Sequence, residues 1–210
     1  MAATLLLVTE VPVRPESVDQ VQATWLTENR SQPTYTQSSV LYRAVGAPAL
    51  MELTALGEPG ELADQERRWR KLGGELAPAL AGDFRRQLLE FVEAPKPTAD
   101  PIPATEYVEL RHVEVRPPAY HAYRAWRDRT IFETVRKADQ VDVFLAYHSL
   151  VSTRPGVVFV SGFDCAPEEY LPVFASQEYR DILVEARDNY IIPAGGDDRG
   201  LSTTVFQRVG

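Results

Sequence analysis

The chain has few of the residues that carry chemistry in many proteins. Among its 210 residues there are one cysteine, three histidines and three lysines. A lone cysteine, Cys165, permits no disulfide within the chain, as is usual in a cytoplasmic protein. The acidic residues around Cys165 would raise the pKa of its thiol and make it a poor nucleophile. No cysteine pair and no HxH or HxxxH spacing indicates a dedicated metal site.

Long apolar stretches and basic surfaces are missing as well. No window approaches the roughly 20 apolar residues of a membrane span, and the apolar start of the chain lacks the positive region of a signal peptide. The net charge is −8, with 10 basic and 14 acidic residues up to Pro103 and 12 and 16 after it. Without a basic stripe to pair with phosphate, we expect no nucleic acid partner, no membrane partner and a cytoplasmic location.

Nucleotide-cofactor motifs are also absent. No GxGxxG follows a predicted strand, so neither a flavin nor a nicotinamide is implied. The segment from Ala194 to Gly200 is glycine-rich but lacks the lysine of a phosphate loop, and we interpret it as a lid or a connector. Haem needs only one axial histidine, but no helix-borne histidine signature matches. We therefore expect no cofactor, with haem kept as an alternative.

What the sequence does contain is an internal repeat. Val11-Pro12-Val13-Arg14-Pro15 returns about 100 residues later as Val113-Glu114-Val115-Arg116-Pro117, and a tryptophan follows each copy, Trp25 and Trp126. A second match aligns residues 83–90 with residues 178–185 through an acid, aromatic, Arg, x, x, Leu, x, Glu pattern. Such repetition predicts one folding unit written twice.

The order of predicted elements repeats too. In the first unit we expect a strand, a helix, two strands, a helix and a final short strand, at residues 4–13, 16–28, 38–43, 49–56, 61–72 resuming at 77–91, and 91–93. In the second unit the same order falls at residues 106–116, 119–137, 144–153, 157–163, 167–190 and 201–209, with a turn at Arg154-Pro155-Gly156 between its middle strands. The order βαββαβ is the split form of the ferredoxin-like motif.

Four prolines separate the two units. Pro95, Pro97, Pro101 and Pro103 lie within eleven residues, which neither a helix nor a central strand accepts. We therefore divide the chain into a first unit at 1–94, a linker at 95–104 and a second unit at 105–210. One such unit leaves a bare sheet face that must be buried. The predicted fold class is α+β, with two tandem ferredoxin-like units packing sheet to sheet as an α/β barrel within the chain.

On this element order and on the paired Val-x-Val-Arg-Pro segments, the chain resembles the dimeric α/β-barrel superfamily in its fused form. That superfamily includes antibiotic-biosynthesis monooxygenases, some polyketide cyclases, stress-responsive barrel proteins, chlorite dismutases and haem-degrading enzymes. The resemblance is one of topology and covers nearly the whole chain. It implies a fold and a range of chemistries, without choosing among them.

Histidines point to the second unit as the place of an active site. His112, His121 and His148 all lie there, and the first unit has none. His112 shares one side of its strand with Val108 and Leu110, so it would face a cavity if that side lines one. His148 begins the predicted hairpin, whereas His121 lies on the solvent side of its helix. Ordinary polar roles for all three are the competing interpretation.

Two aromatic residues and two arginines complete the candidates. Tyr123 and Trp126 share one helix face, where they either pack the helix onto the sheet or form a wall for a planar substrate. Arg43 and Arg111 are carried by strands and could stabilise an oxyanion. The candidate catalytic residues are thus His112, His148, Tyr123, Trp126 and Arg111, with no metal ligand and no cofactor-binding residue.

Three functions are compatible with this set. The first is a cofactor-independent monooxygenase that binds a small aromatic polyketide intermediate of secondary metabolism and molecular oxygen, since a deprotonated phenolic substrate can itself reduce oxygen. The second is a polyketide cyclase or dehydratase without redox chemistry. The third is a non-catalytic small-molecule-binding or stress-responsive barrel protein. A homodimer is compatible with each.

Overall fold

The computed structural model describes residues 1–31, 39–153, 156–192 and 200–209. The glycine-rich segment predicted as a lid or connector lies outside the described residues except for Gly200, and so do the first two residues of the predicted turn at Arg154-Pro155-Gly156. No helix among the described residues is long and apolar enough to cross a membrane.

Eight strands and the helices between them form two βαββαβ units. The first unit consists of β1 (Leu5–Pro12), α1 (Val18–Ser31), β2 (Ser39–Ala44), β3 (Ala49–Leu56), α3 (Glu61–Leu76) and β4 (Arg85–Lys96). The second consists of β5 (Tyr107–Val113), α4 (Tyr120–Asp128), α5 (Ile131–Lys137), β6 (Val143–Val151), β7 (Val157–Phe163), α6 (Pro167–Tyr170), α7 (Gln177–Asn189) and β8 (Leu201–Val209).

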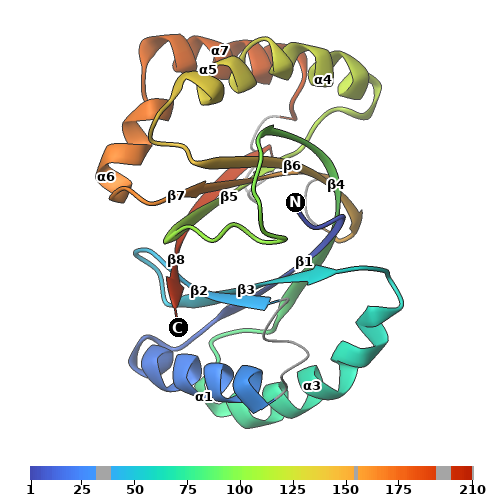
Figure 1. The fold of residues 1–210 in the computed structure, drawn as a ribbon, viewed down its shortest axis with the longest axis vertical. Coiled ribbons are helices and arrows are strands. Elements are labelled where there is room, and N and C mark those ends of the chain that lie inside the picture. The colour runs from blue at the N-terminus through green and yellow to red at the C-terminus, as the bar shows by residue number, and fades with distance from the viewer. Residues whose placement is uncertain (32–38, 154–155, 193–199, 210) are drawn as a thin grey trace.

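The strands close into a single antiparallel barrel in the order β1-β3-β2-β8-β5-β7-β6-β4. Within each unit the neighbours follow the ferredoxin-like order, β4-β1-β3-β2 and β8-β5-β7-β6. The two sheets join where β2 pairs with β8 and β4 pairs with β6, which leaves no sheet edge exposed for aggregation. The helices of the two units cover opposite outer sides of this barrel (Figure 1). The predicted fold class is confirmed.

The first of the two sequence matches marks equivalent places in the fold. After β1 and after β5 the chain enters a short 3-10 turn that begins at a proline, Pro15 or Pro117. An isolated bridge then ties each entry point to the end of the unit's helical layer, Val13 to Leu80 and Val115 to Ile191. The tryptophans after each copy are both buried.

The second match is wrong as a structural equivalence. Residues 85–96 form strand β4, whereas residues 177–189 form helix α7, so the predicted helix at 77–91 is wrong too. Leu88 and Leu89 are buried on opposite faces of β4, one beneath α3 and the other inside the barrel. A strand buried on both faces lacks the alternation that separates it from a helix. Gly73 and Gly74 do not end the preceding helix, because α3 runs through them to Leu76.

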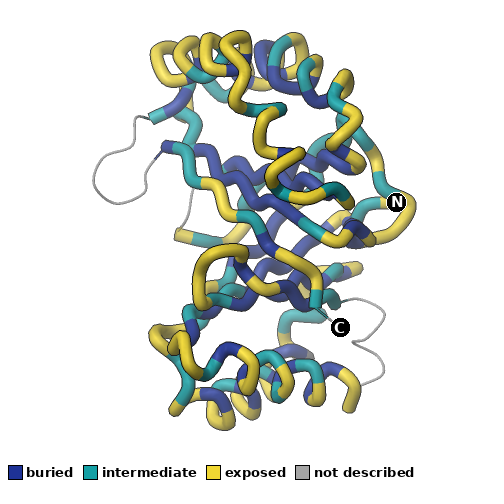
Figure 2. The backbone as a smooth tube through the Cα atoms, turned by 90° about the vertical axis from the view of Figure 1, so that its left-hand side faces the viewer, coloured by how far each residue is buried: buried dark blue, intermediate teal, exposed yellow. Residues whose placement is uncertain are grey.

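The long helix predicted at 119–137 is divided in two. A 3-10 turn covers Pro117–Ala119, α4 ends at Asp128, and Thr130 has a non-helical backbone before α5 begins. Buried residues concentrate in the strands, and exposed residues concentrate along the outer helices (Figure 2). The break bends the helical layer over the sheet, which keeps Trp126 and Phe132 in one core with β6 and β7.

One end of the barrel is filled by the chain between the two units. Ile102 is buried with the residues of the barrel interior, the Tyr42 hydroxyl donates to the carbonyl of Pro103 at 3.3 Å, and the amide of Ala3 donates to the carbonyl of Pro101 at 2.9 Å. Burial raises the pKa of Tyr42, so its phenol stays protonated and keeps donating. The proline-rich segment thus fills this end of the barrel.

Candidate functional site

The inward-facing side chains become polar toward the other end of the barrel. On β5 the inward series Val108 and Leu110 ends at His112, and on β4 the series from Leu89 continues to Gln87. The same change occurs on β1, where Glu10 follows Val8, and on β8. Because side chains alternate between the two faces of a strand, these polar groups belong to the lumen. The barrel therefore has one plugged apolar end and one polar mouth.

A cavity of about 1300 Å³ opens at this mouth. Its wall from the barrel includes Glu10, Arg85, Ser202, Thr204 and Phe206. The second unit adds Tyr120, His121 and His148. The wall is mixed, with apolar side chains such as Phe206 beside charged, hydroxyl and ring-nitrogen groups that could orient a bound molecule.

His148 is the predicted site residue that this cavity exposes. It lies on β6, half-buried, with its ring set edge-on against Tyr120 at 5.2 Å between ring centroids. A Cβ at Gly156 would stand 3.2 Å from His148 Nε2. Gly156 also lines the cavity, and because it has no side chain it leaves room beside that nitrogen. His148 can therefore exchange a proton with a bound molecule.

His112 lies deeper, inside the lumen, where it is 4 % exposed. Its Nε2 is 3.0 Å from Gln87 Oε1. Gln87 in turn lines a second cavity of about 440 Å³, which shares Glu10, Arg85 and Thr153 with the first. His112 thus connects to the cavities through Gln87.

Tyr123 and Trp126 are placed in the core between the helices and the sheet. Both are 1 % exposed, their rings are 5.8 Å apart, and they pack in the cluster that contains Phe144 and Phe159. Burial raises the pKa of Tyr123, so its phenol does not act as a base near neutral pH. The position matches the packing interpretation of this helix face.

Arg111 points to the outer side of β5, away from the lumen that holds His112. Its Nη2 is 2.7 Å from Glu109 Oε1 and its Nη1 donates to the Tyr179 hydroxyl at 2.5 Å. The burial of Arg111 works against its charge, but the neighbouring Tyr179 and Glu109 outweigh it and raise its pKa. Arg43 is exposed on β2 and pairs with Asp19. Of the predicted set, the structure brings only His148 and, through Gln87, His112 to the connected cavities.

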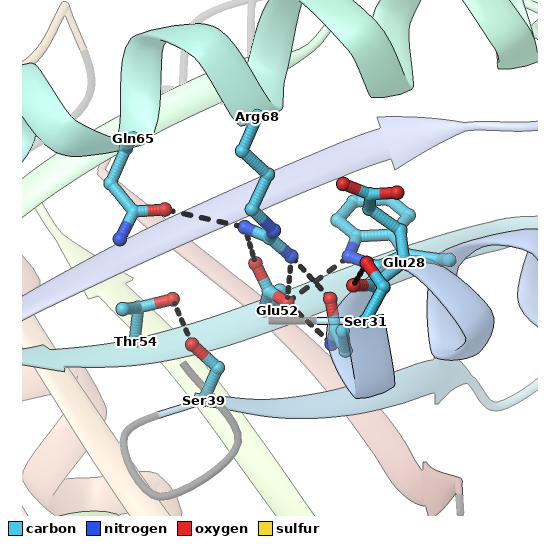
Figure 3. A network of polar contacts seen from close by, with 9 residues as sticks. Glu28, Ser31, Ser39, Glu52, Thr54, Gln65 and Arg68 are labelled. Atoms are coloured by element: carbon cyan, nitrogen blue, oxygen red, sulfur yellow. Dashed lines mark hydrogen bonds and ion pairs between the residues drawn. The ribbon is translucent and has the colours of Figure 1, made fainter. Parts of the chain in front are cut away.

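A buried polar network that the sequence analysis does not predict lies in the first unit (Figure 3). Arg68 on α3 binds Glu52 on β3 through Nη2 to Oε1 at 2.6 Å and through Nη1 to Oε2 at 2.9 Å. Trp25 and Asn29 on α1 donate to the same carboxylate at 3.1 Å and 2.9 Å. The available signal was an acid inside the apolar strand Ala49–Leu56. Glu10, Arg85 and Gln87 were missed as well, although each continues an inward period-two series.

Within the described ranges, no group of three or more His, Cys, Asp or Glu residues is arranged to hold a metal ion. Burial and the nearby Glu169 carboxylate raise the pKa of the Cys165 thiol, which agrees with the expectation that it is a poor nucleophile.

Comparison with known proteins identifies the fold. No family model matches the chain, and no curated protein sequence matches it. An anthrone oxidase-like protein superposes with a TM-score of 0.74 and 11 % identity over 98 % of this chain and 91 % of its own. A candidate monooxygenase from Fusobacterium nucleatum gives 0.69 and 10 % over 100 % and 94 %. A ferredoxin-fold protein of Listeria monocytogenes related to antibiotic biosynthesis monooxygenases gives 0.55 and 7 % over 99 % and 96 %.

These likenesses extend along whole chains, so they support the fused barrel from end to end. At such identities they show the fold alone, and the chemistry must be argued from the cavity.

Proposed function

We propose that this protein is a cofactor-independent monooxygenase that oxidises an aromatic, polyketide-type substrate in the mouth cavity. The observation that carries the proposal is that His148, beside whose Nε2 Gly156 leaves room, lines a cavity large enough for a polycyclic ligand. The fold neighbours named as monooxygenase and anthrone oxidase-like proteins support the same class of chemistry.

The reaction needs a base, an oxyanion partner and a ring-shaped pocket. His148 takes a proton from an activated CH₂ or phenol, and the resulting anion is delocalised over the substrate rings. Arg85 lies on the wall of the same cavity, where its positive charge stabilises the developing oxyanion. Tyr120 holds the imidazole edge-on and limits its rotation.

Oxygen enters by electron transfer from the substrate itself. The anion gives one electron to O₂, the two radicals combine into a C–O bond, and the peroxide loses water. For a ring CH₂ the balance is CH₂ + O₂ → C=O + H₂O, so the substrate supplies all the electrons. The protein binds, deprotonates and excludes competing water.

Oxygen uptake by metal-free protein with an anthrone, followed by product mass, tests the proposal. We expect uptake of one O₂ per product, and His148→Gln should lower the rate by about 10²-fold or more. His121→Gln is the matched control, since His121 lines the same cavity from the exposed side of α4. Loss of water without oxygen uptake would show a cyclase or dehydratase instead, and binding without turnover would show a carrier.

A further inference from the structure

An arginine without a counter-ion lies beside the proposed site. Arg86 is half-buried on the outer face of β4, and its guanidinium carbon is 4.4 Å from the centre of the Trp69 ring and 5.0 Å from that of Phe84. Among the side chains that the structure describes, no carboxylate lies within ion-pair distance of it. A desolvated charge with no partner is costly, so this arrangement requires an explanation.

The guanidinium carbon of Arg86 lies over the Trp69 and Phe84 rings. The N–H groups of a guanidinium lie in its own plane, where they match the two oxygens of a carboxylate. Arg86 Nε is buried and has no hydrogen-bond partner among the described residues. The side chain is thus oriented for a planar acceptor that the protein does not supply.

Two further donors beside Arg86 are in the same condition. Trp69 Nε1 and Thr9 Oγ1 are buried and, in the part of the chain that the structure describes, have no hydrogen-bond partner. Thr9 on β1 stands directly opposite Arg86 in the β1–β4 ladder, so the two Cβ atoms on that face are about 5 Å apart. Three orphaned groups within one neighbourhood indicate a missing acceptor.

Charges of both signs surround Arg86. Burial lowers the pKa of Arg86, the Asp83 carboxylate raises it, and Arg68 and Glu52 act in opposite directions. On the outer face, Glu52, Thr9 and Arg86 occupy neighbouring positions across β3, β1 and β4. Glu52 is already bound by Arg68, and among the described side chains Asp83 forms no ion pair with Arg86, so Arg86 can still pair with a ligand carboxylate.

Access comes from the 440 Å³ cavity, which Arg86 and Phe84 line together with Ser152 and Thr153. The pairing of β4 with β6 begins at Leu88, so the start of β4 borders this cavity. The cavity shares Glu10, Arg85 and Thr153 with the mouth cavity. The two cavities are therefore adjacent.

We infer that the substrate is an acid whose carboxylate binds Arg86 in the smaller cavity while its aromatic rings occupy the mouth cavity. This inference rests on the proposed function for the aromatic rings of the substrate. The Arg86 site adds that the substrate carries a carboxylate.

Calorimetric titration under anaerobic conditions tests this without turnover. The probes are 3-hydroxy-2-naphthoate and its carboxamide, which differ only in the charge of one group. We expect the protein to bind the acid at least tenfold more tightly than the amide. Arg86→Gln should abolish that preference and leave the amide affinity within twofold. Arg70→Gln is the matched control, an exposed arginine one residue after Trp69, and should keep the preference.

Three outcomes overturn the inference. If the unaltered protein binds the acid and the amide with equal affinity, the carboxylate is not recognised. If Arg86→Gln lowers the affinity for both ligands equally, Arg86 has a structural role only. If acetate alone binds as tightly as the naphthoate, the site binds a free anion.

Two controls separate recognition from stability. The urea midpoint of ligand-free Arg86→Gln should not fall, because the variant loses an unpaired buried charge. Arg86→Lys keeps the charge but not the forked guanidinium, and it should regain part of the preference for the acid. Oxygen uptake is measured separately, so failure of the proposed function leaves this result readable.

Discussion

Arg68 on α3 and Glu52 on β3 form a bidentate ion pair, and both side chains are only 1 % exposed. The guanidinium makes contacts with both carboxylate oxygens, at 2.6 Å and 2.9 Å. Trp25 and Asn29 bring the second helix of the layer to the same carboxylate. The pair thus fixes how α1 and α3 sit on the sheet of the first unit.

Removing one partner of this pair should be far worse than removing both. Arg68→Met leaves an unpaired buried carboxylate, and we expect the free energy of unfolding to fall by about 3–5 kcal/mol. The double variant Arg68→Met with Glu52→Leu should recover most of that loss. Urea unfolding followed by circular dichroism measures both, and a double variant no better than the single one would contradict this account.

Gly156 should matter for activity because of the space it leaves. In Gly156→Ala the new Cβ would stand 3.2 Å from His148 Nε2, so the imidazole must shift, and a displaced base should slow turnover by about tenfold or more. Gly74→Ala is the control, since a Cβ there meets nothing within 4 Å and should stabilise α3 by about 0.5–1 kcal/mol. An unchanged turnover rate in Gly156→Ala would argue against His148 as the base.

Alkaline pH should destabilise the fold. Burial raises the pKa of Tyr42, Tyr123, Tyr147, Tyr170 and Tyr179 above the ordinary value. The unfolded chain therefore releases these protons first, and stability is full below about pH 10 and falls above it. Each tyrosine contributes a slope of about 1.4 kcal/mol per pH unit. Urea midpoints from pH 8 to 11 measure the slope, and Tyr147→Phe should make it shallower.

Chelation should leave activity intact. We expect the purified protein to show no Soret band and to consume oxygen with an anthrone at the same rate after dialysis against EDTA, because the substrate anion supplies the electrons. Absorption spectra, metal analysis and oxygen-electrode rates before and after dialysis provide the check. Recovery of a lost rate on adding iron or haem would replace the proposed mechanism.

The elements that could be read from the sequence were those with local signals. β7 and β8 have the predicted bounds, 157–163 and 201–209, because turn residues and β-rich runs define them. The sequence pattern predicts a helix over residues 85–91 of β4, because its leucines are buried on both faces, and predicts a strand only at residues 91–93. The repeated Arg-Pro turn could also be predicted from a local signal, because proline restricts the backbone at its own position.

The site could be read only in part. His148 was identified by residue type, but nothing local indicated that Gly156 would leave room beside its Nε2 or that Tyr120 would hold its ring. Tyr123 and Trp126 share a helix face in either interpretation, and only the packing against β6 and β7 distinguishes core from cavity wall. The sequence does not single out Arg86, because the lack of a hydrogen-bond partner for its Nε among the described residues is recognised only once its neighbours in the fold are known.

The sequence by itself determined the two βαββαβ units, since hydrophobic period, prolines and the internal repeat act over short stretches of chain. The tertiary structure decided which end of the barrel is plugged, where the cavities lie and which charges are left unpaired. These depend on strand register and on contacts between residues far apart in the chain, such as Thr9 with Arg86 and Tyr42 with Pro103, and no local pattern encodes them.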